Sequence, residues 1–79
     1  MRKLLGRTRA RVLEAIAERP GCTTTELAAA ARIAVASASE HTAVLRQAGL
    51  VRTVRHRNTA LHTSAPLGLA LLNGRSHRN

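Results

Sequence analysis

Hydrophobic side chains recur at helical spacing near the start of the chain and predict an amphipathic helix over residues 7–18. Charged side chains occupy many of the remaining positions of this helix. Pro20 disfavours the helical conformation in the residue before it, so we expect the helix to end at the Arg19-Pro20-Gly21 sequence. The apolar positions expected to face the core are Leu5, Val12, Leu13 and Ile16.

A second helix is predicted over residues 24–31. Thr23 and Glu26 have the spacing of a capping box, in which the threonine oxygen accepts from the backbone N–H of Glu26 and the carboxylate accepts from the N–H of Thr23. The alanine-rich sequence that follows favours a helix and allows a neighbouring helix to approach closely. The side chains expected to face the core are Leu27 and Ala28.

A third helix is predicted over residues 34–48, and Gly49 suits the left-handed position that ends a helix. Its core side consists of Ala38, Thr42 and Leu45. The opposite side is small or polar and consists of Ala36, Ser39, Glu40, Ala43 and Arg46, with Ser37 near the helix start. Such a surface fits the major groove of DNA, where it leaves room for hydrogen bonds to base edges. It equally fits an ordinary solvent-facing side, and this helix alone does not distinguish the two.

Two runs rich in β-branched residues, 50–55 and 59–64, predict a β-hairpin. The turn between them contains Asn58, which tolerates the left-handed conformation. Three arginines lie on or near the tip of this hairpin, namely Arg52, Arg55 and Arg57.

Pro66 suits the first residue of a last, apolar helix over residues 66–72, which we expect the Asn73-Gly74 pair to end. A domain this small cannot cover such a helix completely, which predicts contact with a second subunit. The chain is therefore interpreted as one domain, residues 1–74, followed by a basic disordered tail, residues 75–79.

The charge of the chain is strongly unbalanced. Thirteen Lys and Arg residues face four acids, for a net charge of +9, and no acid follows residue 40. Clustered arginine in so basic a domain is typical of proteins that bind polyanions. A GC-rich genome explains the amount of arginine but less readily the absence of acids from one half, so we favour nucleic acid as the partner.

The composition also excludes several classes of protein. There is no aromatic residue, hence no stacking platform for single-stranded nucleic acid. The single cysteine, Cys22, cannot form a disulfide within the chain. The sequence contains no Asp and no phosphate-binding glycine loop, so nothing in it supports an enzyme. No apolar run approaches the roughly 18 residues that a membrane helix needs, so a cytoplasmic protein is expected.

The predicted elements follow the order of a winged helix-turn-helix domain, a mainly α fold with a three-helix core, a two-stranded wing and a C-terminal helix. Ser39-Glu40-His41, together with residues 44–51, resembles the recognition helix and wing entry of ArsR-type bacterial transcriptional regulators. The resemblance extends over about residues 5–72. It implies a sequence-specific regulator that binds double-stranded DNA, as a homodimer formed through the first and last helices.

The sequence departs from the ArsR-type pattern at three places. Thr42 stands where a core Leu is usual, and Arg32 occupies a turn position usually given to Gly, where a left-handed backbone costs about 1 kcal/mol. Ala34-Val35 replaces a Ser-Pro opening of the recognition helix, which removes an N-cap worth roughly 1 kcal/mol. These departures favour a weakly stable member, and they leave the DNA-reading side intact.

The resemblance assigns candidate DNA contacts along the third helix. Ser37 and Ser39 would read bases, with Ala36 available to thymine methyl groups, and Arg46 would contact phosphate or the edge of the DNA groove. His41 is either a residue that orients the helix on DNA or a half-buried histidine bonded to backbone.

Glu40 and the hairpin complete the candidate site. Glu40 is either solvated, paired with arginine, or an acceptor from a cytosine amino group, the last being the less favoured interpretation. Arg55 and Arg57 are expected along the minor groove and Arg52 on phosphate.

Metal sensing, which is common among ArsR-type proteins, is not expected here. Cys22 is the only thiol, and His56 and His62, on opposite arms of the hairpin, could approach one another but have no third ligand. We therefore predict no metal, no cofactor and no evident small-molecule effector. Two alternatives remain for the function: a winged-helix protein–protein interaction module, and an RNA-binding protein. Salt-dependent, sequence-selective binding to duplex DNA would distinguish the leading hypothesis from both.

Overall fold

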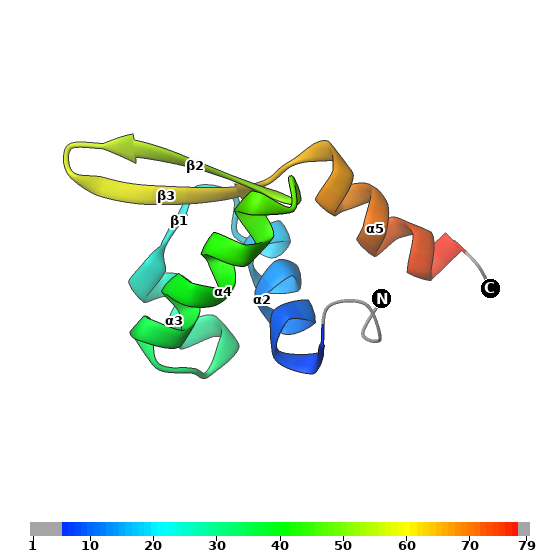
Figure 1. Ribbon diagram of the computed structural model, residues 1–79, viewed down its shortest axis with the longest axis horizontal. Helices are drawn as coiled ribbons and strands as arrows, with labels where there is room; N and C mark the ends of the chain where they lie inside the picture. Colours follow the sequence, from blue (N-terminus) through cyan, green and yellow to red (C-terminus); the bar gives the residue numbers. More distant parts are fainter. Residues whose placement is uncertain (1–5, 78–79) are drawn as a thin grey trace.

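The computed structural model describes residues 6–77, and its elements follow the predicted order. Three helices lie together beneath a long β-hairpin, and the last helix extends away from them at the other end of the molecule (Figure 1). The mainly helical architecture expected from the sequence is confirmed. The elements are α2 (Arg7–Glu18), β1 (Cys22–Thr23), α3 (Thr24–Ala31), α4 (Val35–Gln47), β2 (Val51–His56), β3 (Thr59–Ser64) and α5 (Pro66–His77).

The hairpin belongs to a three-stranded antiparallel sheet in the order β1-β3-β2, where the sequence predicted two strands. The additional strand, β1, pairs Cys22 with His62 and Thr23 with Leu61. The backbone N–H of Gly21 extends this pairing by donating to the carbonyl of His62 at 2.8 Å. Two residues are too few to leave a period-two pattern in the sequence, which is why β1 was not predicted.

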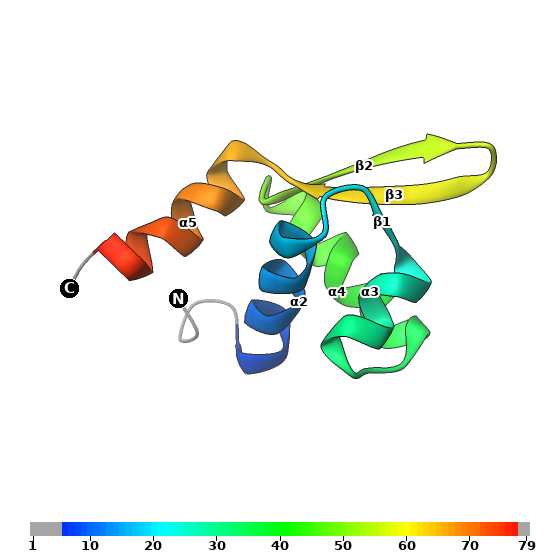
Figure 2. The ribbon, with the colours of Figure 1, turned by 180° about the vertical axis from the view of Figure 1, so that it is seen from behind.

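The core lies where α2, α3 and α4 meet under the sheet, and α2 comes to the front in the reverse view (Figure 2). It is built from aliphatic side chains, as the composition requires, and the predicted inward positions are buried on all three helices. Leu5 lies outside the described residues. The largest fully buried side chains are Leu13, Ile16, Leu27, Leu45, Val12 and Thr42.

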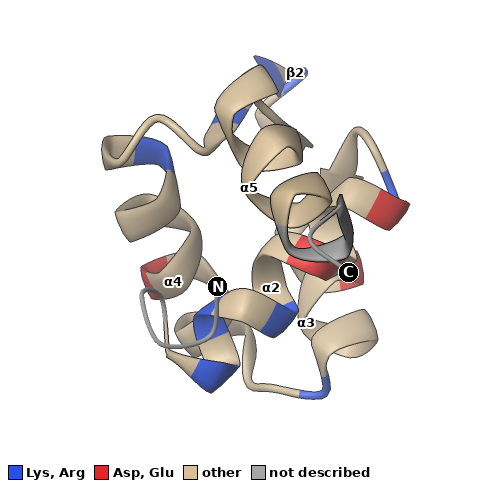
Figure 3. Cartoon of the chain, turned by 90° about the vertical axis from the view of Figure 1, so that its right-hand side faces the viewer, with Lys and Arg blue, Asp and Glu red and all other residues tan. Residues whose placement is uncertain are grey.

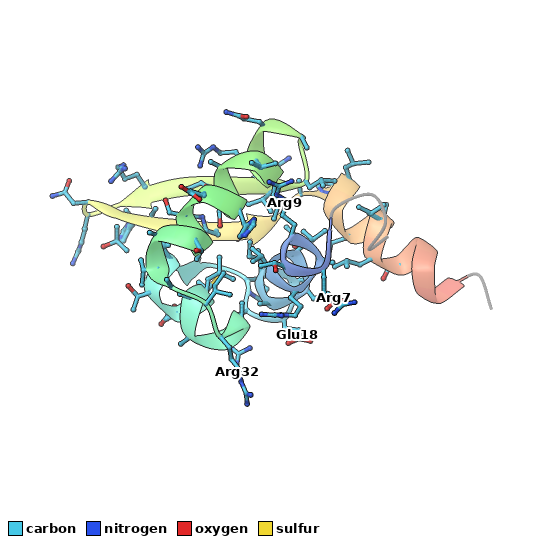
Figure 4. The ribbon with its side chains drawn as sticks, turned by 60° about the horizontal axis from the view of Figure 1, so that its bottom comes forward. Arg7, Arg9, Glu18 and Arg32 are labelled. Carbon is cyan, nitrogen blue, oxygen red and sulfur yellow. The ribbon has the colours of Figure 1, made fainter. Side chains whose placement is uncertain are left out.

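The ends of α3 and α4 agree with the sequence analysis, including two of the three departures. The capping box is present, with Thr23 Oγ1 accepting from the N–H of Glu26 at 3.1 Å and the N–H of Thr23 donating to the Glu26 carboxylate at 2.9 Å. Arg32 has a left-handed backbone with φ of 59°. Ala34 is the N-cap of α4 and provides no side-chain hydrogen bond. The side chain of Arg32 points away from the molecule (Figure 4).

The third departure, Thr42, is accommodated within its own helix. The side chain is buried, and its hydroxyl donates to the carbonyl of Ala38 at 2.7 Å. The hydroxyl in the core is therefore satisfied, so no unpaired polar group results from the missing Leu.

The hairpin turns through Arg57 and Asn58, both with positive φ, at 51° and 65°. Positive φ at both central residues is characteristic of the type I′ turn, whose twist matches that of the flanking strands. The left-handed Asn58 was expected, whereas the left-handed Arg57 was not. Strand β2 runs one residue later than predicted, from Val51 to His56.

Helix α5 begins at Pro66, as predicted, but continues past Asn73 and Gly74 to His77. Gly74 does not have a positive φ, so its backbone continues the helix and does not end it. The predicted tail, residues 75–79, thus lies partly in α5 and partly outside the described residues. Near the helix start, Gly68 is required because an added Cβ would overlap the carbonyl oxygen of Leu50.

Candidate nucleic-acid interface

Helix α4 has one buried side and one open side, because an α-helix advances about 100° per residue. Ala38, Thr42 and Leu45 are buried against the core, as predicted. Four residues of the predicted opposite side are exposed, namely Ala36, Ser39, Glu40 and Arg46, and the fifth, Ala43, is half-buried. Most of the side proposed for DNA from the sequence is therefore open to solvent.

Ser37 and His41 lie on a flank of α4 and are half-buried, apart from the open side. The Nδ1 atom of His41 is buried and has no hydrogen-bond partner within the part of the chain that the structure describes. One of the two interpretations of His41 was a half-buried histidine bonded to backbone. The side chain is half-buried, but the structure shows no such bond at Nδ1.

The other flank of α4 faces the hairpin across a groove of about 250 Å³, which we call the wing groove. It brings together three of the predicted site residues, Ser39, Arg46 and Arg55. Two arginines and no acid line it, so its electrostatic potential is positive. The wing groove is lined by Thr24, Ser39, Thr42, Ala43, Arg46, Thr53, Arg55, Ala60 and His62.

The hairpin divides its arginines between two faces, since successive side chains of a strand point to opposite sides. Thr53 and Arg55 line the wing groove, so Arg52 lies on the opposite face of β2. Arg57 is in the turn at the tip. The sequence analysis grouped Arg55 with Arg57 and set Arg52 apart, whereas in the structure only Arg55 shares the wing groove with Arg46.

Acidic side chains are confined to the helices, and the hairpin carries only basic charges. In Figure 3 the red positions lie on the helices, whereas β2 shows only blue. Glu40 is exposed on the open side of α4, and no ion pair is formed by it among residues 6–77. The carboxylate therefore lies in solvent, which agrees with the solvated alternative for Glu40.

His62 is the residue that the sequence analysis misjudged. The sequence analysis allowed it to approach His56 across the hairpin, but it is only 3% exposed and forms the floor of the wing groove. The register pairs His62 with Thr53 and His56 with Thr59, three positions further along β2 and on the other face. The two histidines therefore do not approach one another.

Both ring nitrogens of His62 have threonine partners. Nε2 lies 2.8 Å from Thr24 Oγ1 and Nδ1 lies 3.0 Å from Thr53 Oγ1. Thr53 Oγ1 also accepts a long hydrogen bond of 3.5 Å from Arg46. Burial and then the Arg46 charge lower the pKa of His62 from its ordinary value of 6.5. The alternation of β3 does contain a signal for this residue, because His62 is in phase with the buried Ser64.

Residues 6–77 contain no grouping of side chains suited to binding a metal ion. No three His, Cys, Asp or Glu side chains are grouped there in a way that would hold a metal ion. Cys22 is buried, which raises the pKa of its thiol, and its sulfur lies 4.0 Å from the carbonyl of His62. The helices of this part of the chain are too short or too polar to cross a membrane.

The α3–turn–α4 pair, supported by α2 and flanked by the hairpin, defines a winged helix-turn-helix domain. The chain belongs to the family of helix-turn-helix domains, whose profile matches residues 4–54, more than half of its length. No curated protein matches the sequence.

Solved structures of transcription regulators have the same fold. BpsR of Bordetella bronchiseptica, whose DNA binding is regulated by 6-hydroxynicotinic acid, has a TM-score of 0.80 and 24% identity over 85% of this chain and 50% of its own. A MarR-family regulator from Silicibacter pomeroyi has a TM-score of 0.82 and 21% identity over 92% and 52%. A predicted DNA-binding regulator from E. coli has a TM-score of 0.80 and 20% identity over 99% and 84%. This chain thus spans about half the length of the first two.

Proposed function

We propose that this chain is the DNA-binding domain of a transcription regulator, with α4 in the major groove of duplex DNA and the hairpin over the flanking backbone. The observation that carries the proposal is the wing groove, with Arg46 on its helix side and Arg55 on its strand side. A phosphate backbone separates the major from the minor groove of DNA. A positively charged channel between a helix and a wing suits that backbone.

Within this arrangement, the open side of α4 meets the bases. Ser39 and Ala36 are exposed there and have the small size needed for close contact with base edges. We assign Arg46 and Arg55 to phosphate and Arg57, at the tip of the hairpin, to the minor groove. These basic contacts position the domain, while the serine supplies sequence preference.

The remaining candidates have less direct roles. Ser37 and His41 lie on the half-buried flank, so we assign them to fixing the orientation of α4 on DNA. Glu40 is solvated in the free protein and would disfavour nearby phosphate unless a cytosine amino group donates to it. Arg52 lies on the far face of the hairpin and is assigned no contact inside the wing groove.

For the type of regulator, the sequence of the recognition helix supports the ArsR type. The run Ser39-Glu40-His41, followed by residues 44–51, carries that assignment, and it forms most of α4 and the start of β2. The solved structures with this fold include MarR-family proteins. The ArsR-type assignment therefore rests on this run alone.

We further propose that the domain acts as a homodimer through its first and last helices. Leu67 and Leu69 of α5 are 57% and 44% exposed, an apolar surface that a second subunit would cover. Sedimentation equilibrium of the wild type and of Leu69→Glu tests this. We expect the dimer to dissociate in the variant, and an unchanged mass would contradict the proposal.

The proposed DNA contacts are tested by measuring affinity for a duplex over a salt series. Arg55→Ala should lower the salt slope by about 0.9, the value for one phosphate contact on B-DNA. Arg52→Ala is the matched control, because it removes the same charge from the opposite face of the same strand. Arg57→Ala should also lower the slope by about one, without altering sequence preference. Equal slopes for Arg55→Ala and Arg52→Ala would remove the wing groove from the interface.

Sequence preference is tested by selecting binding sites from random duplexes. Ser39→Ala should relax the preference at one base pair, whereas an equal loss of affinity on every sequence would exclude base reading by Ser39. Failure to bind any duplex, together with tight binding to RNA or to a protein, would favour the alternative functions.

A further inference from the structure

His62 joins three elements of the proposed interface at one point. It belongs to β3 of the wing, its Nε2 contacts Thr24 in the first turn of α3, and its Nδ1 contacts Thr53 of β2. Through Thr53 this chain of hydrogen bonds reaches Arg46 of α4. Beyond this level the hairpin is open to solvent, since residues 54–59 are all exposed.

Donors and acceptors can be assigned consistently along the series of hydrogen bonds from Arg46 to Thr24. Arg46 can only donate, so Thr53 Oγ1 accepts from it and can give its own hydroxyl proton to Nδ1 of His62. Nε2–H then donates to Thr24 Oγ1. If His62 takes up a second proton, both ring nitrogens donate to the two threonine oxygens, so the contacts persist in either state.

We propose that His62 is a positioning residue of the DNA interface: it fixes the wing against α3 and, through Thr53, directs the Arg46 guanidinium into the wing groove. This inference rests on the proposed function, since it concerns how that interface is held. A guanidinium held in place before binding loses less conformational entropy when a phosphate arrives.

The charges around His62 make its role measurable through pH. Arg46 of α4 and Arg55 of β2 line the same wing groove, Cys22 of β1 lies against the His62 backbone, and Glu26 of α3 is engaged in the capping box. In the free protein, burial and Arg46 lower the pKa of His62. A phosphate in the wing groove adds a negative charge beside the ring and raises this pKa. Binding then takes up a proton, so affinity rises as the pH falls through the raised pKa of the bound state.

A double-mutant cycle tests the positioning role directly. Thr53→Val removes the central hydroxyl and keeps a β-branched residue in the strand, so we expect the fold to persist and duplex affinity to fall about threefold to tenfold, the range for one hydrogen bond. In an Arg46→Gln background, the same change should have little effect. Additive losses would mean that Thr53 acts without Arg46 and would overturn the proposal.

Thr63→Val is the matched control for this cycle. Thr63 lies on the other face of β3, where its hydroxyl accepts from the N–H of Gly21 at 3.1 Å. Its loss removes a structural hydrogen bond but none that reaches the wing groove. Circular dichroism should show folded protein in each case, and affinity should be unchanged in Thr63→Val. A loss equal to that in Thr53→Val would mean that any weakening of the hairpin lowers affinity.

The pH profile provides the second readout. Between pH 7.5 and 5.5 we expect wild-type affinity to increase, by at most about tenfold per pH unit for one linked proton. His62→Gln, which keeps a donor and an acceptor but does not titrate, should lose this increase, whereas His56→Gln should retain it. Identical profiles for wild type and His62→Gln would contradict the inference.

The free protein supplies a measurement that needs no DNA. The pKa of His62 is lower in the folded than in the unfolded state. The neutral side chain therefore contributes fully to the free energy of unfolding above pH 6.5, and this contribution is lost as the pH falls towards the pKa of the folded state. NMR titration of the ring should show this lowered pKa. Duplex binding with no coupling to His62 would end this inference alone, whereas a lowered pKa without duplex binding would end the proposed function.

Discussion

Helices α3 and α4 form the two halves of the helix-turn-helix, yet they begin in different ways. The start of α3 has a complete capping box between Thr23 and Glu26, whereas Ala34 at the start of α4 has no oxygen to offer. The turn between them also passes through Arg32 in a left-handed conformation. α3 is thus fixed by local sequence, and α4 is held mainly by the burial of its core side. The stability of the domain is therefore open to improvement at α4 and open to loss at α3.

The largest effect on this comparison should come from Thr23→Val. The substitution keeps the side-chain shape and removes the oxygen that accepts from Glu26, so unfolding free energy should fall by about 1–2 kcal/mol. For a domain of this size each kcal/mol lowers Tm by about 4–8 °C. Thermal unfolding of Thr25→Val, an exposed neighbour in the same turn, provides the control. If both variants lost the same stability, the capping box would not be the cause.

Ala34→Ser should shift stability in the opposite direction. A serine oxygen at this N-cap can accept from a backbone N–H in the first turn of α4, which is worth about 1 kcal/mol. Ala30→Ser, at an exposed position within α3, should instead lose a few tenths of a kcal/mol through helix propensity. Chemical denaturation of the three proteins measures the difference. A destabilised Ala34→Ser would show that the start of α4 cannot adopt the capping geometry.

A smaller gain is expected from Arg32→Gly. The left-handed backbone costs an L-residue about 1–2 kcal/mol, and the greater freedom of an unfolded glycine returns part of this, leaving about 0.5 kcal/mol. Arg32→Ala removes the same charge but keeps the strain, so it should not gain stability. A gain in both variants would point to charge repulsion as the cost at this position.

Much of this architecture could be predicted because the signals are local. The capping box, the helix-ending Gly49 and the core positions of α4, which recur at helical spacing, depend on residues close together in the sequence. The left-handed Arg32 and the bare Ala34 followed from the resemblance, and both are present.

What could not be predicted depends on contacts across the sheet. β1 is only two residues long, and it pairs with the outer edge of β3 at His62, which would otherwise be unpaired. The contacts of His62 with Thr53 and Thr24 follow from strand register and from the packing of the hairpin on α3, which the sequence did not specify. The separation of Arg52 from Arg55 follows from the alternation of side chains along β2, and it could have been predicted. The end of α5 was also misplaced, since a glycine can continue a helix at a cost of about 1 kcal/mol.

The smallest effect is expected from Thr42→Val, inside α4 itself. The Thr42 hydroxyl is paired with the carbonyl of Ala38 in its own helix, and this carbonyl keeps its backbone partner when the hydroxyl is removed. Replacing a satisfied hydroxyl by a methyl group of the same shape is nearly neutral, so we expect a change below about 0.5 kcal/mol. Urea unfolding measures it, with Ala38→Gly as a control that weakens the same turn. A loss above 1 kcal/mol would mean that the hydroxyl contributes to holding α4, and that α4 depends on a local polar bond as α3 does.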